Sequence, residues 1–210
     1  MITDKKSLQF YLDADRYALG MTSKSVLLSR NPVWRFERLM RKCEYLKNTK
    51  APKFIYALTL LRYERLSTKL GFSISLNCFG PGLRINHYGL LTVNSKARIG
   101  KWCDIHQGVN IGENGYVDAD GSFVSQVPNV GDYVFIGLGA KLYGNINVGD
   151  SVRIAANAVV SCDVEKGHTI AGYPSCQVVR EHHSNKGHIS SVEFEKSFME
   201  KFPQYEDYLR

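Results

Sequence analysis

The chain has 210 residues, of which 44% are hydrophobic and 22% are charged, a composition typical of a folded globular protein. Its net charge is +7, but the basic residues are scattered and match no nucleic-acid-binding motif, so we expect no nucleic-acid partner. No apolar run approaches the ~20 residues that span a bilayer, and residues 1–10 lack the apolar core of a signal peptide, which predicts a cytoplasmic protein.

Residues 1–72 predict an α-helical N-terminal region. Apolar residues recur at helical spacing over 5–19, 32–46 and 52–70, and a proline opens the second segment at a position that favours helix initiation. The second and third segments each place arginines largely opposite or beside the apolar face. We interpret this basic face first as solvated surface, with peripheral contact to a membrane surface as the alternative.

Ten aliphatic residues recur every six positions in two runs: Val93, Ile99, Ile105 and Ile111, then Val130, Ile136, Leu142, Val148, Ile154 and Val160. A helix would repeat its apolar residues every three or four positions, and a lone strand every two. A repeat of six instead suits short strands joined by tight turns, with the aliphatic residues in one axial column. The spacing therefore predicts a mainly β protein with a parallel β-helix over 73–180. The tail, 181–210, is expected to be helical.

The six-residue spacing breaks between Ile111 and Val130. The intervening segment, 113–129, is rich in Gly, Asp and Ser, and predicts a loop. An insertion in one coil of a solenoid leaves the array from one face, which is often the working face. We therefore expect this loop to lie over an active cleft and to help select the acceptor.

The stretch 80–179 resembles the serine acetyltransferase branch of the hexapeptide-repeat acyltransferases. The resemblance lies in GPGLRINH (80–87), IHQGVNIG (105–112), IGLGAKLYGNI (136–146), IAANAVV (154–160) and AGYP (171–174). It implies a left-handed β-helix, a homotrimer, and acetyl-CoA bound as acyl donor between neighbouring subunits. The short N-terminal helices resemble a compact branch associated with surface-polysaccharide biosynthesis.

The resemblance also assigns roles to single residues. His87 matches the catalytic histidine of the family, and a neutral imidazole is a suitable base for a hydroxyl proton near pH 7. The expected acceptor-binding residues are Asn86, Tyr88, Trp102 and His106, with His106 one coil beyond His87. The expected acetyl-CoA-binding residues are Gly137, Leu138, Gly139, Ala155, Ala156, Asn157, Lys166 and Arg180. Asp104 and Glu113 are candidates to orient His87.

Two departures from the family pattern bear on the acceptor. The position fifteen residues before His87 is an aspartate in the family and Phe72 here, and the segment 123–128, which includes Val127, lacks the family's further serine-binding groups. A bound amino acid needs charged partners for its ammonium and carboxylate groups. We therefore expect an O-acetyltransferase acting on a sugar or polysaccharide hydroxyl, with serine O-acetylation as the alternative.

Two functions from other classes compete with this interpretation. The γ-type carbonic anhydrases share the β-helix, but their zinc needs three converging histidines, and His168, His182, His183 and His188 lie far from His87 and His106 along the chain. The five cysteines show no CxxC or metal-ligand spacing and predict reduced thiols, so we expect no metal. A non-catalytic trimeric scaffold is the other alternative, and His87 in its motif argues against it.

Overall fold

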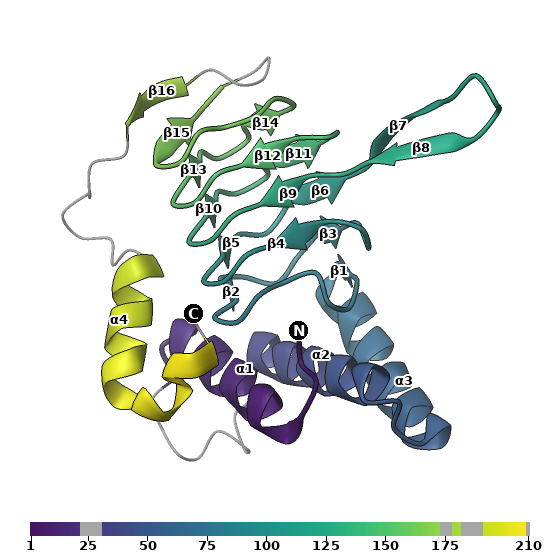
Figure 1. The fold of residues 1–210 in the computed structure, drawn as a ribbon, viewed down its shortest axis with the longest axis vertical. Helices are drawn as coiled ribbons and strands as arrows, with labels where there is room; N and C mark the ends of the chain where they lie inside the picture. Colours follow the sequence, from purple (N-terminus) through teal and green to yellow (C-terminus); the bar gives the residue numbers. More distant parts are fainter. Residues whose placement is uncertain (22–30, 173–177, 182–190, 209–210) are drawn as a thin grey trace.

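The computed structural model describes residues 1–21, 31–172, 178–181 and 191–208, and only the backbone of 178–181. Three helices, α1 (Lys5–Ala18), α2 (Pro32–Asn48) and α3 (Lys53–Leu70), form a base beneath a prism of short strands (Figure 1). After the prism, α4 (Ser191–Lys201) and the 3₁₀ helix η2 (Pro203–Tyr208) pack on α1. These bounds agree closely with the helices predicted from the sequence. Among the described residues, no helix has the length and apolarity to cross a membrane.

The prism consists of three sheets, which we name A, B and C. Sheet A contains β1 (Phe72–Ile74), β3 (Leu91–Val93), β6 (Asn110–Gly112), β11 (Lys141–Tyr143) and β14 (Val159–Val160). Sheet B contains β4 (Arg98–Ile99), β9 (Asn129–Val130) and β12 (Asn147–Val148). Sheet C contains β2 (Arg84–Ile85), β5 (Asp104–Ile105), β10 (Phe135–Ile136), β13 (Arg153–Ile154), β15 (His168–Ile170) and the antiparallel β16 (Val178–Glu181). The chain passes through A, B and C in turn, so the predicted parallel β-helix is confirmed.

The ten aliphatic residues of the six-residue repeat form the axial core of the prism. None of them is more than 4% exposed. They stack in register from coil to coil, with Val130 beside Val148 and Ile136 beside Ile154. Because burying one aliphatic side chain stabilises a fold by about 1.5–3 kcal/mol, this column supplies much of the stability of the prism. The structure has the left-handed β-helix fold that the resemblance implied.

The segment predicted as a loop is instead a β-hairpin that projects from the prism (Figure 1). Its strands are β7 (Asn114–Val117) and β8 (Phe123–Gln126), and Tyr116 pairs with Val124 across them. The turn is closed by the amide of Gly121, which donates to the carbonyl of Asp118. The composition of the turn concealed the short β-forming runs on either side of it.

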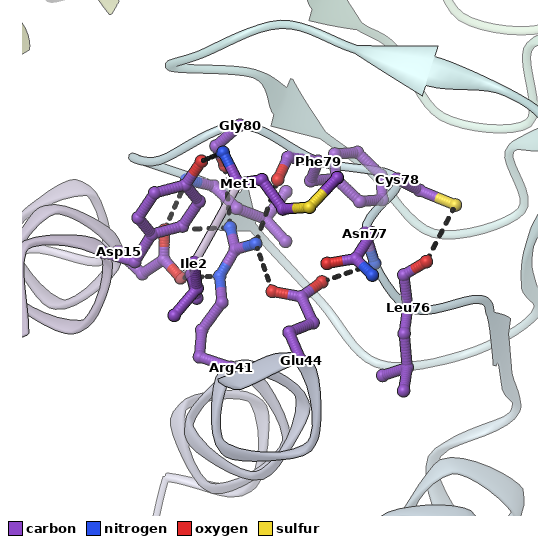
Figure 2. A network of polar contacts seen from close by, with 12 residues as sticks. Met1, Ile2, Asp15, Arg41, Glu44, Leu76, Asn77, Cys78, Phe79 and Gly80 are labelled. Atoms are coloured by element: carbon purple, nitrogen blue, oxygen red, sulfur yellow. Dashed lines mark hydrogen bonds and ion pairs between the residues drawn. The ribbon is translucent and has the colours of Figure 1, made fainter. Parts of the chain in front are cut away.

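The first coil of the prism has no coil beneath it, so its backbone groups need other partners. Buried side chains of α1 and α2 supply them (Figure 2). Arg41 donates to the carbonyl oxygens of Phe79 and Gly80 at 2.9 and 2.7 Å, and Asp15 accepts from the amide of Leu83 at 2.9 Å. Arg41 and Asp15 also form an ion pair of 2.7 Å. The side chains thus replace the hydrogen bonds of a missing strand.

Two further carboxylates complete this end of the prism. Glu44 accepts from the amide of Asn77 at 2.7 Å, and Glu37 accepts from the amide of Ile85 at 3.3 Å. Burial raises the pKa of Glu37 well above its usual value, and the nearby Asp15 carboxylate raises it further. Four buried side chains thus join the helices to the prism, and none is more than 1% exposed. We name this group the charged junction: Asp15, Glu37, Arg41 and Glu44.

A second hydrophobic cluster joins the two ends of the chain beside the prism. It contains Phe10 of α1, Trp102 of the prism and Phe198 of α4. Cys43, Cys78 and Cys103 are buried free thiols elsewhere in the core, but Cys162 is disulfide-bonded. The expectation that every cysteine is reduced is therefore wrong.

Candidate active site

His87 lies in the turn between β2 and β3, at the corner where sheet C meets sheet A. Its side chain is exposed and lines a cavity of about 480 Å³. The other lining residues come from β2, from the same turn and from the facing ends of α1 and α2: Leu19, Asn31, Pro32, Val33, Arg84, Ile85, Asn86 and Tyr88. The imidazole of His87, the predicted proton acceptor, therefore stands in a cavity between the prism and the N-terminal helices.

His106 stands close to His87, as expected, but the coil between them is longer than the 18 residues that three six-residue repeats would give. Ile85 pairs with Ile105, so the first coil has 20 residues and not 18, and His106 follows β5 as Asn86 follows β2. The ring centroids of His87 and His106 are 6.3 Å apart. The longer first coil places His106 beside Asn86, and both histidines at one corner.

A polar cluster surrounds the Asp104 carboxylate on sheet C. The amide nitrogen of Asn86 donates to Asp104 and lies 3.1 Å from His106 Nε2. His106 Nε2 lies 3.8 Å from Asp104 Oδ1. Arg84 approaches the other carboxylate oxygen at 3.6 Å. Asp104 thus bridges a cation, an amide and an imidazole on two neighbouring coils.

The two candidates for orienting His87 differ in position. Asp104 belongs to the cluster, but its contacts are with Arg84, Asn86 and His106. Glu113 follows β6 on sheet A and accepts from the side chain of Asn94 at 3.1 Å. Glu113 is therefore at a different corner, and of the two candidates only Asp104 lies in the cluster beside the histidines of its own chain.

The ion pair between Arg84 and Asp104 was not predicted from the sequence. A signal was present, because Arg84 and Asp104 each precede the buried isoleucine of their strand and so face outward at one ladder position. The guanidinium of Arg84 also lies 5.5 Å from the ring centroid of Phe194 in α4. The C-terminal helix therefore lies beside Arg84, a contact that no local pattern indicates.

A column of small residues runs along the same corner, one turn per coil. It contains six of the positions expected to bind acetyl-CoA: Gly137, Leu138, Gly139, Ala155, Ala156 and Asn157. A Cβ on Gly137 would lie 2.7 Å from the amide nitrogen of Ala156, and Gly139 has a φ of +68°. Stacking of the coils thus requires glycine at position 137, and the left-handed turn favours glycine at position 139. The resulting low relief fits an extended, narrow ligand such as the pantetheine arm of acetyl-CoA.

The remaining two positions expected to bind acetyl-CoA lie away from this column. Lys166 is in the turn between sheets B and C, where its amine lies 3.8 Å from the Asp150 carboxylate and its side chain is 74% exposed. Arg180 is in β16, opposite Thr169. Lys141 lies nearer, and its amine donates to the carbonyl of Gly108 in the column.

The expected acceptor-binding aromatics also separate. Tyr88 is exposed beside His87 in the cavity. Trp102 is only 2% exposed, at the corner between sheets B and C, and its ring centroid lies 5.5 Å from that of Phe198. The assignment of Trp102 to the acceptor site is therefore wrong, because its ring belongs to the core between the prism and α4.

The hairpin does not lie over His87 of its own chain. It leaves after β6 of sheet A and returns to β9 of sheet B, so it projects from a different corner of the prism (Figure 1). Within the described part of the chain, no group of three or more His, Cys, Asp or Glu side chains is arranged to hold a metal ion. The chemistry that this corner itself offers is proton transfer by an imidazole beside the column of small residues.

Comparison with known proteins finds similarity to serine acetyltransferases. No protein-family model matches the chain. A serine acetyltransferase of Synechococcus elongatus is 35% identical over 101 residues, which are 48% of this chain and 39% of that protein. Serine acetyltransferases of Helicobacter pylori and Mycobacterium tuberculosis are 39% and 34% identical over 44% and 51% of this chain, and 52% and 44% of their own lengths. The chain thus spans about half the length of the curated relatives it matches.

Solved structures give the same result for the fold. The serine acetyltransferase of Neisseria gonorrhoeae superposes with a TM-score of 0.67 at 24% identity, over 86% of this chain and 70% of that one. A serine acetyltransferase in complex with CoA superposes with a TM-score of 0.63 at 26% identity, over 83% and 71%. The resemblance to the serine acetyltransferase branch of the hexapeptide-repeat acyltransferases is confirmed.

These comparisons overturn the sugar or polysaccharide acceptor predicted from the sequence. The relatives and structural neighbours are serine acetyltransferases, which was the alternative. The prediction relied on Phe72, whose side chain offers no charge to an amino-acid acceptor, but one motif position does not exclude charged groups elsewhere at the site. Phe72 is indeed buried, but Arg84 and Asp104 place opposite charges next to His106.

Proposed function

We propose that this protein is an acetyl-CoA-dependent O-acetyltransferase whose acceptor is L-serine. One observation carries the proposal: His87 stands at the head of the small-residue column and beside the paired charges of Arg84 and Asp104. The names of the relatives support serine as the class of acceptor, and the positions of these residues support a base, a donor site and charged partners at one corner of the prism.

The proposed reaction needs one proton carrier. His87 takes the proton of the serine hydroxyl, and the oxygen attacks the thioester carbonyl carbon of acetyl-CoA. The bond between carbon and sulfur then breaks, and the imidazolium returns the proton to the departing CoA sulfur. The products are O-acetylserine and CoA. The exposed position of His87 in its cavity leaves the imidazole accessible to both substrates.

The proposed acceptor contacts follow from charge. The guanidinium of Arg84 suits a carboxylate, because Arg presents paired donors to two oxygens. The carboxylate of Asp104 suits an ammonium group. The two side chains are 3.6 Å apart, so serine would bind by opening this ion pair and satisfying both of its members. Phe194 packs beside Arg84 and limits the directions in which the guanidinium can move.

The donor site and the assembly are proposed together. The column at the corner of sheets C and A is open on its outer side, so a single prism offers one wall of a groove. A neighbouring subunit in a trimer would supply the other wall and would enclose the acetyl-CoA arm. One of the structures that superpose on this chain is a serine acetyltransferase in complex with CoA, which supports CoA as the carrier.

The test offers acetyl-CoA and L-serine to the full chain and follows release of free CoA. L-alanine serves as the control acceptor, because it keeps the ammonium and carboxylate but lacks the hydroxyl. Arg84→Gln should raise the Michaelis constant for serine while that for acetyl-CoA stays within a few-fold. Arg98→Gln is the matched control variant, because Arg98 precedes the buried isoleucine of β4 on sheet B, away from His87.

Serine-dependent release of CoA that alanine does not elicit would support the proposal. No release above background hydrolysis at serine up to about 10 mM, an order of magnitude beyond the usual upper range of Michaelis constants, would reject serine as the acceptor. Equal effects of Arg84→Gln and Arg98→Gln would reject the role of Arg84 in binding the acceptor.

A further inference from the structure

A concave basic surface lies in the helical base, on the other side of α2 from the charged junction. The cavity between α2 and α3 measures about 430 Å³. Five cations line it: Arg35 and Arg38 from α2, and Arg62, Arg65 and Lys69 from α3. The other two lining residues are Leu39 and Leu66. We name this surface the basic groove.

The cations of the basic groove lack acidic partners among the residues that the structure describes. No ion pair or hydrogen bond there involves any of the five. The carboxylates of Glu37 and Glu44 on α2 point into the charged junction, and Glu64 on α3 does not line the cavity. Like charges three or four positions apart destabilise a helix, so Arg62, Arg65 and Lys69 repel one another until an anion screens them.

Exposed apolar side chains continue the groove along α3. Phe54, Leu58 and Leu61 are 74%, 52% and 43% exposed. Their spacing of four and three positions puts them on one helical face, and the next position on that face is Arg65. One side of α3 therefore presents apolar groups in its first half and cations in its second half.

We propose that this face of α3, with the basic groove, docks on the surface of an anionic phospholipid bilayer. The phosphate and carboxylate groups of the lipids would occupy the groove, and Phe54, Leu58 and Leu61 would enter the interfacial layer. A second copy of the chain fits less well, because a two-fold contact through the groove sets five cations against five. A compact charged partner without apolar depth would leave the exposed phenyl and leucine groups in water. This inference is independent of the acetyltransferase proposal.

The test sediments the full chain with lipid vesicles. Vesicles of equal parts phosphatidylcholine and phosphatidylserine should bind the protein, and vesicles of phosphatidylcholine alone should not. Binding should weaken with added salt, because the attraction is largely electrostatic. Arg62→Gln with Arg65→Gln should lower the partition coefficient about 30-fold, since each cation near an anionic surface contributes roughly 1 kcal/mol. Leu58→Gln should lower it about tenfold, from roughly 1.4 kcal/mol of lost apolar burial.

Lys42→Gln with Lys47→Gln is the matched control, because both lysines are exposed on α2 and neither lines the groove. The control pair should change the partition coefficient by less than a few-fold. Equal losses for the two pairs would show attraction to net charge alone and would overturn the proposal. Failure to bind anionic vesicles would also overturn the proposal. Binding of soluble polyglutamate without binding of anionic vesicles would indicate an acidic protein as the partner and would overturn it too. Circular dichroism of each variant would establish that the helices are intact.

Discussion

The two buried regions of this protein achieve stability by opposite means. The axis of the prism is a stack of aliphatic side chains, repeated from coil to coil and devoid of charge. The charged junction, at the end of that stack, buries an arginine and three carboxylates, each with its own backbone partner. The first region repeats the same aliphatic packing in every coil, and the second is one network of hydrogen bonds that occurs once.

The difference shows what each kind of core tolerates. An aliphatic column can lose a methylene group and adjust, because dispersion contacts are many and individually weak. A buried ion network cannot lose one member without leaving another charge without a partner. The end of a β-helix needs such a network, since an edge of unpaired backbone groups would otherwise be buried against α1 and α2.

The strongest test of this contrast removes the central cation of the junction. Arg41→Ala leaves the carboxylates of Asp15 and Glu44 buried without it, and frees the carbonyls of Phe79 and Gly80. We expect a loss of about 3–5 kcal/mol in the free energy of unfolding, measured with urea.

Arg35→Ala, at an exposed position of the same helix, should change the free energy of unfolding by no more than about 0.5 kcal/mol. If Arg41→Ala cost less than about 1 kcal/mol, the junction would contribute little and the contrast between the two regions would disappear.

The catalytic proposal sharpens the comparison, because the two histidines come from different coils. His87 follows β2, which the junction holds, and His106 follows β5, which has neighbours on both sides. His87→Asn should lower turnover by about two orders of magnitude or more, the usual scale for loss of a positioned base, with acetyl-CoA affinity largely kept.

His106→Asn should have a smaller effect, mainly on the Michaelis constant for the acceptor. His168→Asn is the control for any histidine substitution, because His168 Nδ1 lies 3.1–3.2 Å from carbonyl oxygens of its own turn, away from His87. Turnover within a few-fold of the unmodified enzyme for His87→Asn, with a large loss for His106→Asn, would transfer the role of base to His106.

A conservative truncation tests the tolerance of the axial column. Ile136→Val removes one methylene group at a fully buried position between Ile105 and Ile154. We expect a loss of about 0.5–1.5 kcal/mol in the free energy of unfolding, measured by the same urea titration. A loss comparable with that of Arg41→Ala would mean that the column is as intolerant as the junction.

The smallest effect concerns protons. The pKa of Glu37 is raised in the folded protein by burial and by Asp15, so the unfolded chain loses this proton first as the pH rises above about 4.3. Glu37 therefore contributes stability below that pH, and the contribution is lost as the pH increases toward the raised pKa. Glu37→Gln should remove this loss, so its stability relative to the unmodified protein should rise between pH 5 and pH 7, by at most about 1.4 kcal/mol for each pH unit.

Chemical denaturation at each pH would measure this difference. The variant keeps a carbonyl oxygen for the amide of Ile85, so the hydrogen bond itself is not the variable. A difference that falls as the pH rises would contradict the assignment, because it would mean that Glu37 is ionised and stabilising in the folded state.

The sequence by itself determined the β-helix, its axial residues and the helices around it. Each of these depends on a local period: six for the coils, and three to four for the helices. The sequence also located His87 and the small residues of the column, because motif and repeat position coincide there. These features can be predicted without knowing which coils are neighbours in the structure.

Only the tertiary structure decided the surroundings of those residues. The first coil has 20 residues, so Asp104 and His106 meet Arg84 and Asn86 at offsets that an 18-residue period does not give. Trp102 joins α4 of the distant C-terminal part and not the acceptor site, and the hairpin leaves from a corner away from His87. The junction likewise joins α1, α2 and the first coil, up to 68 positions apart. These contacts depend on register and on long-range packing, and neither leaves a periodic pattern in the sequence.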